Sequence, residues 1–98
     1  MPAYVMLFNF TEQGISNAKE SPNRAKAFAQ AIEAAGGRMI GIWWLLGQYD
    51  GLVILEAPDD EAATHLLLGL GMLGNVRTVT MRAFSEEEMG RIVQGLGG

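Results

Sequence analysis

The sequence predicts an α+β fold: a four-stranded antiparallel sheet, helices on one face of that sheet, and a further helix at the C-terminal end. Four segments rich in β-branched, aromatic and other apolar residues alternate with three segments whose apolar residues repeat every three or four positions. Glycine, proline and helix-capping residues punctuate the boundaries between them. Because 98 residues with 49% hydrophobic side chains suffice for one core and not for two, residues 1–98 are expected to form one domain.

The first strand is predicted over residues 4–10, a run of bulky apolar side chains too short for a surface helix. A polar stretch, residues 11–20, follows it. Ser21 then offers a helix cap and Pro22 suits a first turn, so the first helix is expected to start there and to stop at Gly36-Gly37. Its apolar positions, spaced by three and four, are Ala25, Phe28, Ala29, Ile32 and Ala35.

The second and third strands are predicted to form a hairpin. Residues 38–46 are apolar at nearly every position, and residues 52–57 form the returning strand. The glycine-containing segment 47–51 between them marks the turn. Pro58 ends the third strand, because proline lacks the N–H that a sheet ladder requires.

The second helix is predicted from the acidic residues 59–61 to about Leu73. Acidic side chains stabilise the positive end of the helix dipole, and Gly74-Asn75 supplies the stop. Its expected buried face consists of Ala62, Ala63, Leu66, Leu67, Leu70 and Leu73. The fourth strand follows over residues 76–84, with Val or Thr at four positions.

The last helix has the clearest local signature. Ser85 is expected to cap it, and Glu88, three residues on, to return the hydrogen bond as a capping box. The three consecutive acids Glu86, Glu87 and Glu88 are explained by this cap and by the helix dipole. The apolar stripe of this helix is Met89, Ile92, Val93 and Leu96.

This βαββαβ order with an added helix is the ferredoxin-like plan, in which the strands lie in the spatial order 4-1-3-2 and one sheet face stays open. The second strand is nevertheless apolar on both faces, with Ile40, Ile42, Trp44 and Leu46 on one and Met39, Trp43 and Leu45 on the other. Exposing either set of side chains to water is energetically unfavourable. We therefore expect a second subunit to cover the open face in a homodimer or higher oligomer.

Charge and composition exclude several classes of partner. Eleven acidic residues outnumber seven scattered basic ones, giving a net charge of −4, so nucleic acid is not an expected partner. Without cysteine there is neither a disulfide nor thiol catalysis. The N-terminus lacks a basic signal-peptide region, and the apolar tracts 39–47 and 66–74 are about half the ~20 residues that a membrane span needs. A soluble, cytoplasmic protein without membrane contact is expected.

The predicted turn reads Gly47-Gln48-Tyr49-Asp50, which resembles the Gly-x-Tyr-Asp signature of the GYD domain family. Further segments that resemble this family are Thr11-Glu12-Gln13-Gly14, Ser21-Pro22, Gly36-Gly37, Glu56-Ala57-Pro58-Asp59-Asp60, Gly74-Asn75-Val76-Arg77-Thr78 and Ala83-Phe84-Ser85. The resemblance implies a small bacterial or archaeal protein, similar in plan to the dimeric α/β barrel superfamily. Gly51, where a β-branched or small apolar residue is more usual, and Gly69 and Gly71 depart from the pattern.

The predicted topology gathers polar residues at one end of the sheet, called the rim below. Thr11, Tyr49, Asp50, Asn75 and Arg77 are expected there, because the ends of strands one and two and the start of strand four share that edge. The rim has the composition of a polar pocket mouth, and Arg77 is placed to pair with Asp50 directly or through a bound anion. The competing interpretation is that Asp50 satisfies turn amides and Tyr49 only shapes the hairpin.

The single histidine, His65, excludes a multi-histidine metal site and a complete catalytic triad within one subunit. We expect it beside the apolar face of its helix, paired with Glu61, rather than in a catalytic or haem-binding role. Residues 69–74 match G-x-G-x-x-G, but the dinucleotide motif opens a helix whereas this segment closes one. Neither a metal nor a cofactor is therefore expected.

Two classes of function fit these observations. The first is a binding module, which either holds a small apolar or aromatic ligand between the open sheet face and the rim or regulates a partner protein. The alternative is a cofactor-independent oxygenase or isomerase, or a haem-handling enzyme, suggested by the superfamily resemblance alone. Its polar groups would be Asn9, Trp43 or Trp44, Tyr49 and His65. Binding is favoured, because no pair of titratable groups with distinct acid and base roles stands out.

Overall fold

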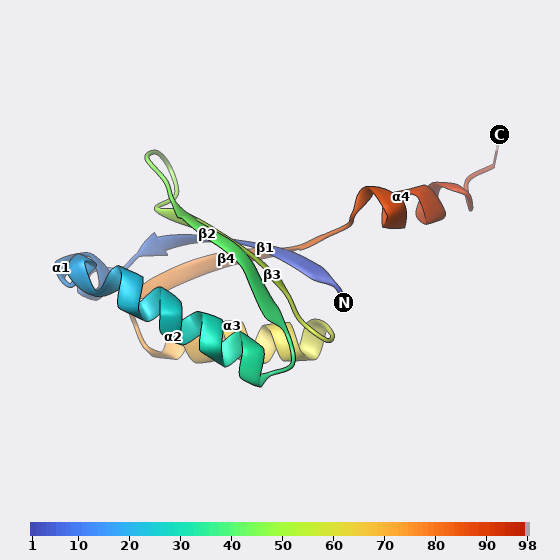
Figure 1. Ribbon diagram of the computed structural model, residues 1–98. Coiled ribbons are helices and arrows are strands. Elements are labelled where there is room, and N and C mark those ends of the chain that lie inside the picture. Colours follow the sequence, from blue (N-terminus) through green and yellow to red (C-terminus); the bar gives the residue numbers. More distant parts are fainter. Residues whose placement is uncertain (98) are drawn as a thin grey trace.

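A computed structural model describes residues 1–97 of the chain. Its four strands are β1 (Ala3–Phe10), β2 (Arg38–Trp44), β3 (Gly51–Glu56) and β4 (Val76–Ala83). Its helices are α1 (Glu12–Ser16), the 3₁₀ helix η1 (Ala18–Glu20), α2 (Ser21–Ala34), α3 (Asp60–Met72) and α4 (Glu86–Val93). Figure 1 shows α2 and α3 together beneath one face of the sheet, with α4 set apart beyond the end of β4.

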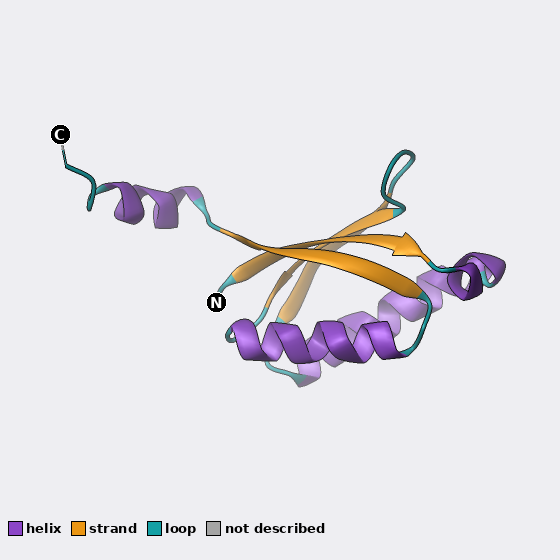
Figure 2. Cartoon of the chain, turned by 180° about the vertical axis from the view of Figure 1, so that it is seen from behind, coloured by secondary structure: helices purple, strands orange, loops and turns teal. Residues whose placement is uncertain are grey.

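The sheet confirms the predicted ferredoxin-like topology. Its strands lie in the order β2-β3-β1-β4, which is the predicted 4-1-3-2 order taken from the other edge. All three strand pairs are antiparallel. Seen from behind, α2 and α3 again lie on the same side of the sheet, while the opposite face carries no helix (Figure 2). Within residues 1–97, no helix is both long enough and apolar enough to cross a membrane.

The core lies between the sheet and the two helices beneath it. Alternation along β1 turns every second side chain toward the helices, as expected for a strand with one buried face. Across the sheet and the two helices, the buried hydrophobic residues are Tyr4, Met6, Phe8, Phe28, Ile32, Val53, Leu55, Ala57, Ala63 and Leu66. The sequence pattern named Phe28, Ile32, Ala63 and Leu66 as core-facing helical positions, and these four are buried.

Strand β2 differs from the prediction in the faces of its side chains. The ladder has an irregularity between Met39 and Gly41, so that Met39 pairs with Leu55 and Ile42 with Val53. Leu55 and Val53 both face the core, which places Met39 and Ile42 on the same side. The prediction that Met39 shares a face with Trp43 is therefore wrong, because a β-bulge adds one residue and reverses the alternation.

Residues 11–20, which were predicted only as a polar stretch, contain two short helices. These are α1 and η1, and Thr11 caps α1 by accepting a hydrogen bond from the Gly14 amide at 3.0 Å. Ser21, predicted as a cap, is instead the first residue of α2, and its buried hydroxyl accepts a hydrogen bond from Arg24 Nη2 at 3.2 Å. The predicted start of this helix is therefore correct, but the predicted capping role of Ser21 is wrong.

Helix α4 begins with the predicted capping box. The Glu88 amide donates to Ser85 Oγ at 3.1 Å, and the Ser85 amide donates to Glu88 Oε1 at 2.9 Å. Arg82 at the end of β4 adds an ion pair to Glu88 at 3.1 Å. Beyond this anchored base, the predicted apolar stripe of Met89, Ile92, Val93 and Leu96 is exposed in the single chain.

The cap makes α4 sensitive to acid. The hydrogen bond from the Ser85 amide and the ion pair with Arg82 lower the pKa of Glu88 from 4.5 to about 2. A carboxylate with a lowered pKa in the folded state stabilises that state above its ordinary pKa, and the contribution is lost as the pH falls from 4.5 toward 2. We expect the Ser85 and Glu88 amide resonances to titrate with a midpoint near pH 2. Glu88→Gln should abolish that titration, and a midpoint near 4.5 in the unmodified chain would contradict it.

Candidate functional site

Asp50 fastens the β2–β3 turn to the end of β1. Its Oδ2 accepts a hydrogen bond from the Phe10 amide at 2.9 Å, and its own amide donates to the Phe8 carbonyl at 2.9 Å. The Leu45 amide donates to the Asp50 carbonyl at 2.8 Å, which closes the turn. Tyr49 beside it is half-buried. The Asp50 carboxylate thus accepts from an amide of β1, whereas the competing interpretation had it satisfy amides of the turn itself.

The other end of the rim is a latch between the end of β1 and the α3–β4 loop. The Thr11 hydroxyl donates to the Gly74 carbonyl at 2.6 Å, and the Thr11 amide donates to the Asn75 carbonyl at 3.1 Å. Gln13 Nε2 donates to Asn75 Oδ1 at 3.0 Å. The Thr11 hydroxyl and amide and both oxygens of Asn75 are thus engaged within the chain.

The structure gathers the predicted rim residues at the end of β1 but does not pair Arg77 with Asp50. Arg77 lies opposite Asn9 in the β1–β4 ladder, and Asn9 Nδ2 donates to the Gln48 carbonyl at 2.9 Å. Among residues 1–97, no ion pair joins Arg77 to Asp50. The direct pairing is wrong, because the Asp50 carboxylate turns to the Phe10 amide instead.

The two tryptophans point to opposite faces, as predicted. Trp43 pairs with Leu52 on the open face and is 51% exposed. Trp44 pairs with Gly51 and lines a cavity on the helix side. Gly51 suits that position because a Cβ there would lie 2.0 Å from the Phe8 ring. The departure at Gly51 therefore makes room for a large aromatic side chain in the neighbouring strand.

His65 lies beside the apolar face of its helix but does not form the expected pair with Glu61. It is exposed on α3 and lines the same cavity as Trp44. Within the described chain, Glu61 forms neither a hydrogen bond nor an ion pair with it, so the predicted pairing is wrong. Residues 1–97 also hold no group of three or more acidic or histidine side chains placed to bind a metal.

The cavity lies between α2, α3 and the helix-side face of the sheet and has a volume of about 660 Å³. Its wall on α2 consists largely of alanines, and its floor includes Phe8, Phe10, Trp44 and Val53. Three of the nine predicted site residues, Trp44, His65 and Asn75, line it. Sequence reasoning placed a ligand on the opposite, open face. The cavity was missed because it depends on the spacing of two helices, which periodicity does not encode.

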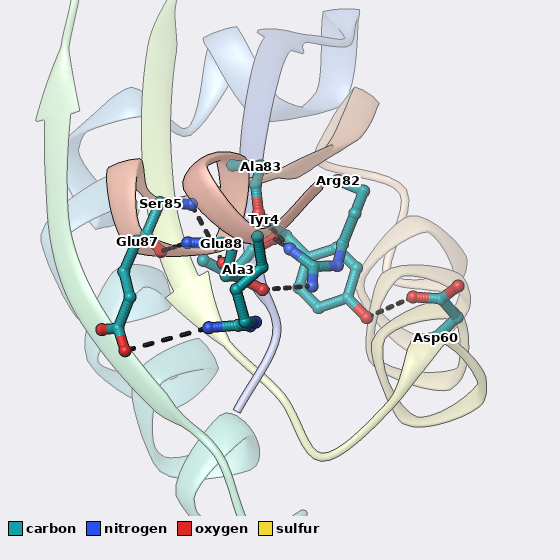
Figure 3. Close-up of polar contacts among 9 residues, drawn as sticks. Ala3, Tyr4, Asp60, Arg82, Ala83, Ser85, Glu87 and Glu88 are labelled. Atoms are coloured by element: carbon teal, nitrogen blue, oxygen red, sulfur yellow. Dashed lines mark hydrogen bonds and ion pairs between the residues drawn. The ribbon is translucent and has the colours of Figure 1, made fainter. Parts of the chain in front are cut away.

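A polar cluster that the sequence did not reveal connects four elements, β1, α3, β4 and α4 (Figure 3). The Tyr4 hydroxyl donates to Asp60 Oδ1 at 2.5 Å, and burial together with that carboxylate raises the pKa of Tyr4 to about 12. The Arg82 guanidinium carbon lies 5.9 Å from the centre of the Tyr4 ring and 4.5 Å from that of Phe84. Arg82 also pairs with Glu88, so the cluster joins the start of β1 and the end of β4 to the starts of α3 and α4.

The strand order and the helices packed on one sheet face define a small α+β domain of the ferredoxin-like class. Residues 4–93 match the model of the GYD domain, and the chain belongs to this family. It is 31% identical over 84 residues to the "Glutamine synthetase and cystathionine beta-lyase binding protein" of Thermus thermophilus, and the match covers 85% of this chain and 88% of that protein.

A solved structure agrees with the fold. The crystal structure of TTHA0845, also from Thermus thermophilus, superposes with a TM-score of 0.51 at 23% sequence identity. The match covers 87% of this chain and 95% of that one. This structural match supports the arrangement of strands and helices and nothing further.

Proposed function

We propose that this chain is a single-domain, cytoplasmic binding module that pairs with a second copy through the open sheet face and then binds another protein. The observation that carries the proposal is the composition of that face. The apolar side chains that the strand registers place on it are Val5, Leu7, Trp43, Leu52, Ile54, Val79 and Met81. An apolar patch of this kind on a chain of net charge −4 marks a contact surface, because its exposure to water is unfavourable.

Helix α4 enlarges the surface available for pairing. Four strands spaced by about 4.8 Å and about eight residues long span roughly 500 Å², whereas a stable interface buries about 800 Å² per partner. The exposed stripe of α4 supplies apolar area beyond the sheet. A helix of 8 residues is also too short to be stable alone in water, so contact with a second copy would stabilise it.

The Thermus relative supports a protein as the further partner. It is named as binding two enzymes of metabolism, glutamine synthetase and cystathionine β-lyase. We infer that this chain binds enzymes of the same kind from its own organism. Self-association would present two copies of each binding surface, which raises avidity for an oligomeric enzyme without new contacts.

Self-association is tested by placing a charge at the centre of the open face. Leu7 lies between Leu52 and Val79 in the sheet, so Leu7→Lys would bury an unpaired ammonium in the pair. By sedimentation velocity at micromolar concentration, the unmodified chain should run as a dimer or larger species and Leu7→Lys as a 10.6 kDa monomer. Gln30→Lys, an equal charge change at an exposed position of α2, should leave the dimer intact. An unmodified chain that runs as a monomer contradicts the pairing.

Partner binding is tested with purified enzymes. The glutamine synthetase and cystathionine β-lyase of the source organism are each mixed with the chain and sedimented. Co-sedimentation with either enzyme that is weakened at least ten-fold by Leu7→Lys and unchanged by Gln30→Lys is expected. A chain that remains at its own sedimentation coefficient with both enzymes contradicts the protein-binding function.

A further inference from the structure

The cavity on the helix side has walls that leave space for a ligand. Ala27, Ala31 and Ala34 of α2 line it, and each is an exposed residue with a short side chain. Gly69 of α3 also lines it, and a Cβ built at Gly69 meets no atom within 4 Å. The space is therefore unfilled because small residues border it, and its volume of about 660 Å³ falls within the range of small-molecule sites.

The floor of the cavity suits a flat apolar group. Phe8 and Phe10 meet edge to face with ring centres 5.8 Å apart, and both rings line the cavity beside Trp44. Trp44 is 45% exposed in the single chain. Aromatic rings stack or pack edge to face with other aromatic rings, which gives a planar ligand a favourable contact with this floor.

The lining of the cavity holds a cation, the Arg24 guanidinium, and no acidic residue. This contrasts with the chain as a whole, in which acidic residues outnumber lysines and arginines eleven to seven. The Arg24 guanidinium donates to the carbonyls of Asn17 at 3.0 Å and Gly14 at 3.3 Å and to the Ser21 hydroxyl at 3.2 Å. All three acceptors are neutral. Since a guanidinium carries five N–H donors, two remain, and its charge has no carboxylate partner among residues 1–97.

We propose that this cavity binds a small aromatic monocarboxylate, with its ring on the floor formed by Phe8, Phe10 and Trp44 and its carboxylate directed to Arg24. The apolar walls exclude a strongly hydrated ligand, and the unpaired guanidinium selects an anion over a neutral molecule of the same shape. The site lies on the face of the sheet opposite to the proposed dimer contact. It is therefore a second binding function, separate from self-association.

The probe for this site is 2-naphthoate, compared with the neutral 2-naphthamide of nearly the same shape. By isothermal titration of the full chain, naphthoate is expected to bind with a Kd of about 1 mM or lower, the affinity that ligand efficiency predicts for its size. Naphthamide should bind at least ten-fold more weakly. Equal affinities for the two compounds would overturn the anion site without any substitution in the protein.

Two glycines of α3 provide matched variants. Both Gly69 and Gly71 have open space at the Cβ position, but only Gly69 lines the cavity. Gly69→Leu should weaken naphthoate binding at least ten-fold, and Gly71→Leu should leave it unchanged. Equal effects of the two variants would place the ligand elsewhere. Arg24→Gln, checked for helix content by circular dichroism, should remove the preference for naphthoate over naphthamide, and a preserved preference would overturn the role of Arg24.

Failure of this proposal is distinguishable from failure of the proposed function. Naphthoate binding is also measured on Leu7→Lys, where it should be unchanged because Leu7 lies on the other face of the sheet. Sedimentation of Gly69→Leu should match that of the unmodified chain. If Gly69→Leu dissociates the dimer, the cavity holds part of the second copy and the ligand proposal is overturned.

Discussion

Leu55→Ala is expected to lower the free energy of unfolding by about 2–5 kcal/mol, the range for truncation of a fully buried leucine. Leu55 is 0% exposed near the end of β3, between Tyr4 of β1 and Met39 of β2. Removing its branched end costs the transfer free energy of the lost methyl groups and leaves a void that a rigid sheet cannot close. Urea denaturation followed by circular dichroism measures the loss.

The neighbouring residue Ile54 provides the control. It lies on the same strand but faces the open side of the sheet, where it is half-buried in the single chain. Ile54→Ala should cost less than Leu55→Ala at low protein concentration, and its cost should rise with concentration as the pair forms. Equal costs at every concentration would show that the two faces are not buried differently, contrary to the structure.

Gly14→Ala is expected to destabilise the protein by about 2–3 kcal/mol, in the upper range for an overpacked site. A Cβ at Gly14 would stand 1.9 Å from the Asn75 carbonyl oxygen and 2.9 Å from its carbonyl carbon. These atoms belong to backbone that is already held by the Thr11 amide, so no flexible side chain can move aside. The latch between β1 and the α3–β4 loop would have to open.

The matched change is Gly71→Ala in α3. No atom lies within 4 Å of its Cβ position, and alanine favours a helix over glycine by up to about 1 kcal/mol. Gly71→Ala should therefore be neutral or stabilising in the same urea experiment. A Gly14→Ala protein as stable as Gly71→Ala would contradict the close approach of Gly14 to Asn75.

Features that depend on neighbouring residues were predictable from the sequence. The Ser85–Glu88 capping box needs residues three positions apart, and the structure confirms it. The strand order followed from the alternation of strand and helix patterns together with the connection rules for sheets. Trp43 and Trp44 point oppositely because adjacent residues of a strand must do so.

Features that depend on distant residues were not predictable in the same way. Ser21 has the residue type of a cap, but Arg24 one turn later takes its hydroxyl. The bulge between Met39 and Gly41 leaves no mark in the hydropathy pattern, because both possible faces of β2 are apolar. The Asp50 carboxylate accepts from the Phe10 amide, 40 positions away in the sequence, and the cavity depends on how far apart two helices pack.

The central position of β1 determines when the sheet can be completed during synthesis. Phe10, at the end of β1, pairs with Val76, which is made 66 residues later (76 minus 10). At about 5–20 residues per second, the first strand waits roughly 3–13 s for its last partner. Meanwhile β2 and β3 can pair with each other as a local hairpin, and β3 can join β1. A nascent chain arrested before β4 thus exposes one whole unpaired edge of an apolar strand, the kind of edge to which other chains add.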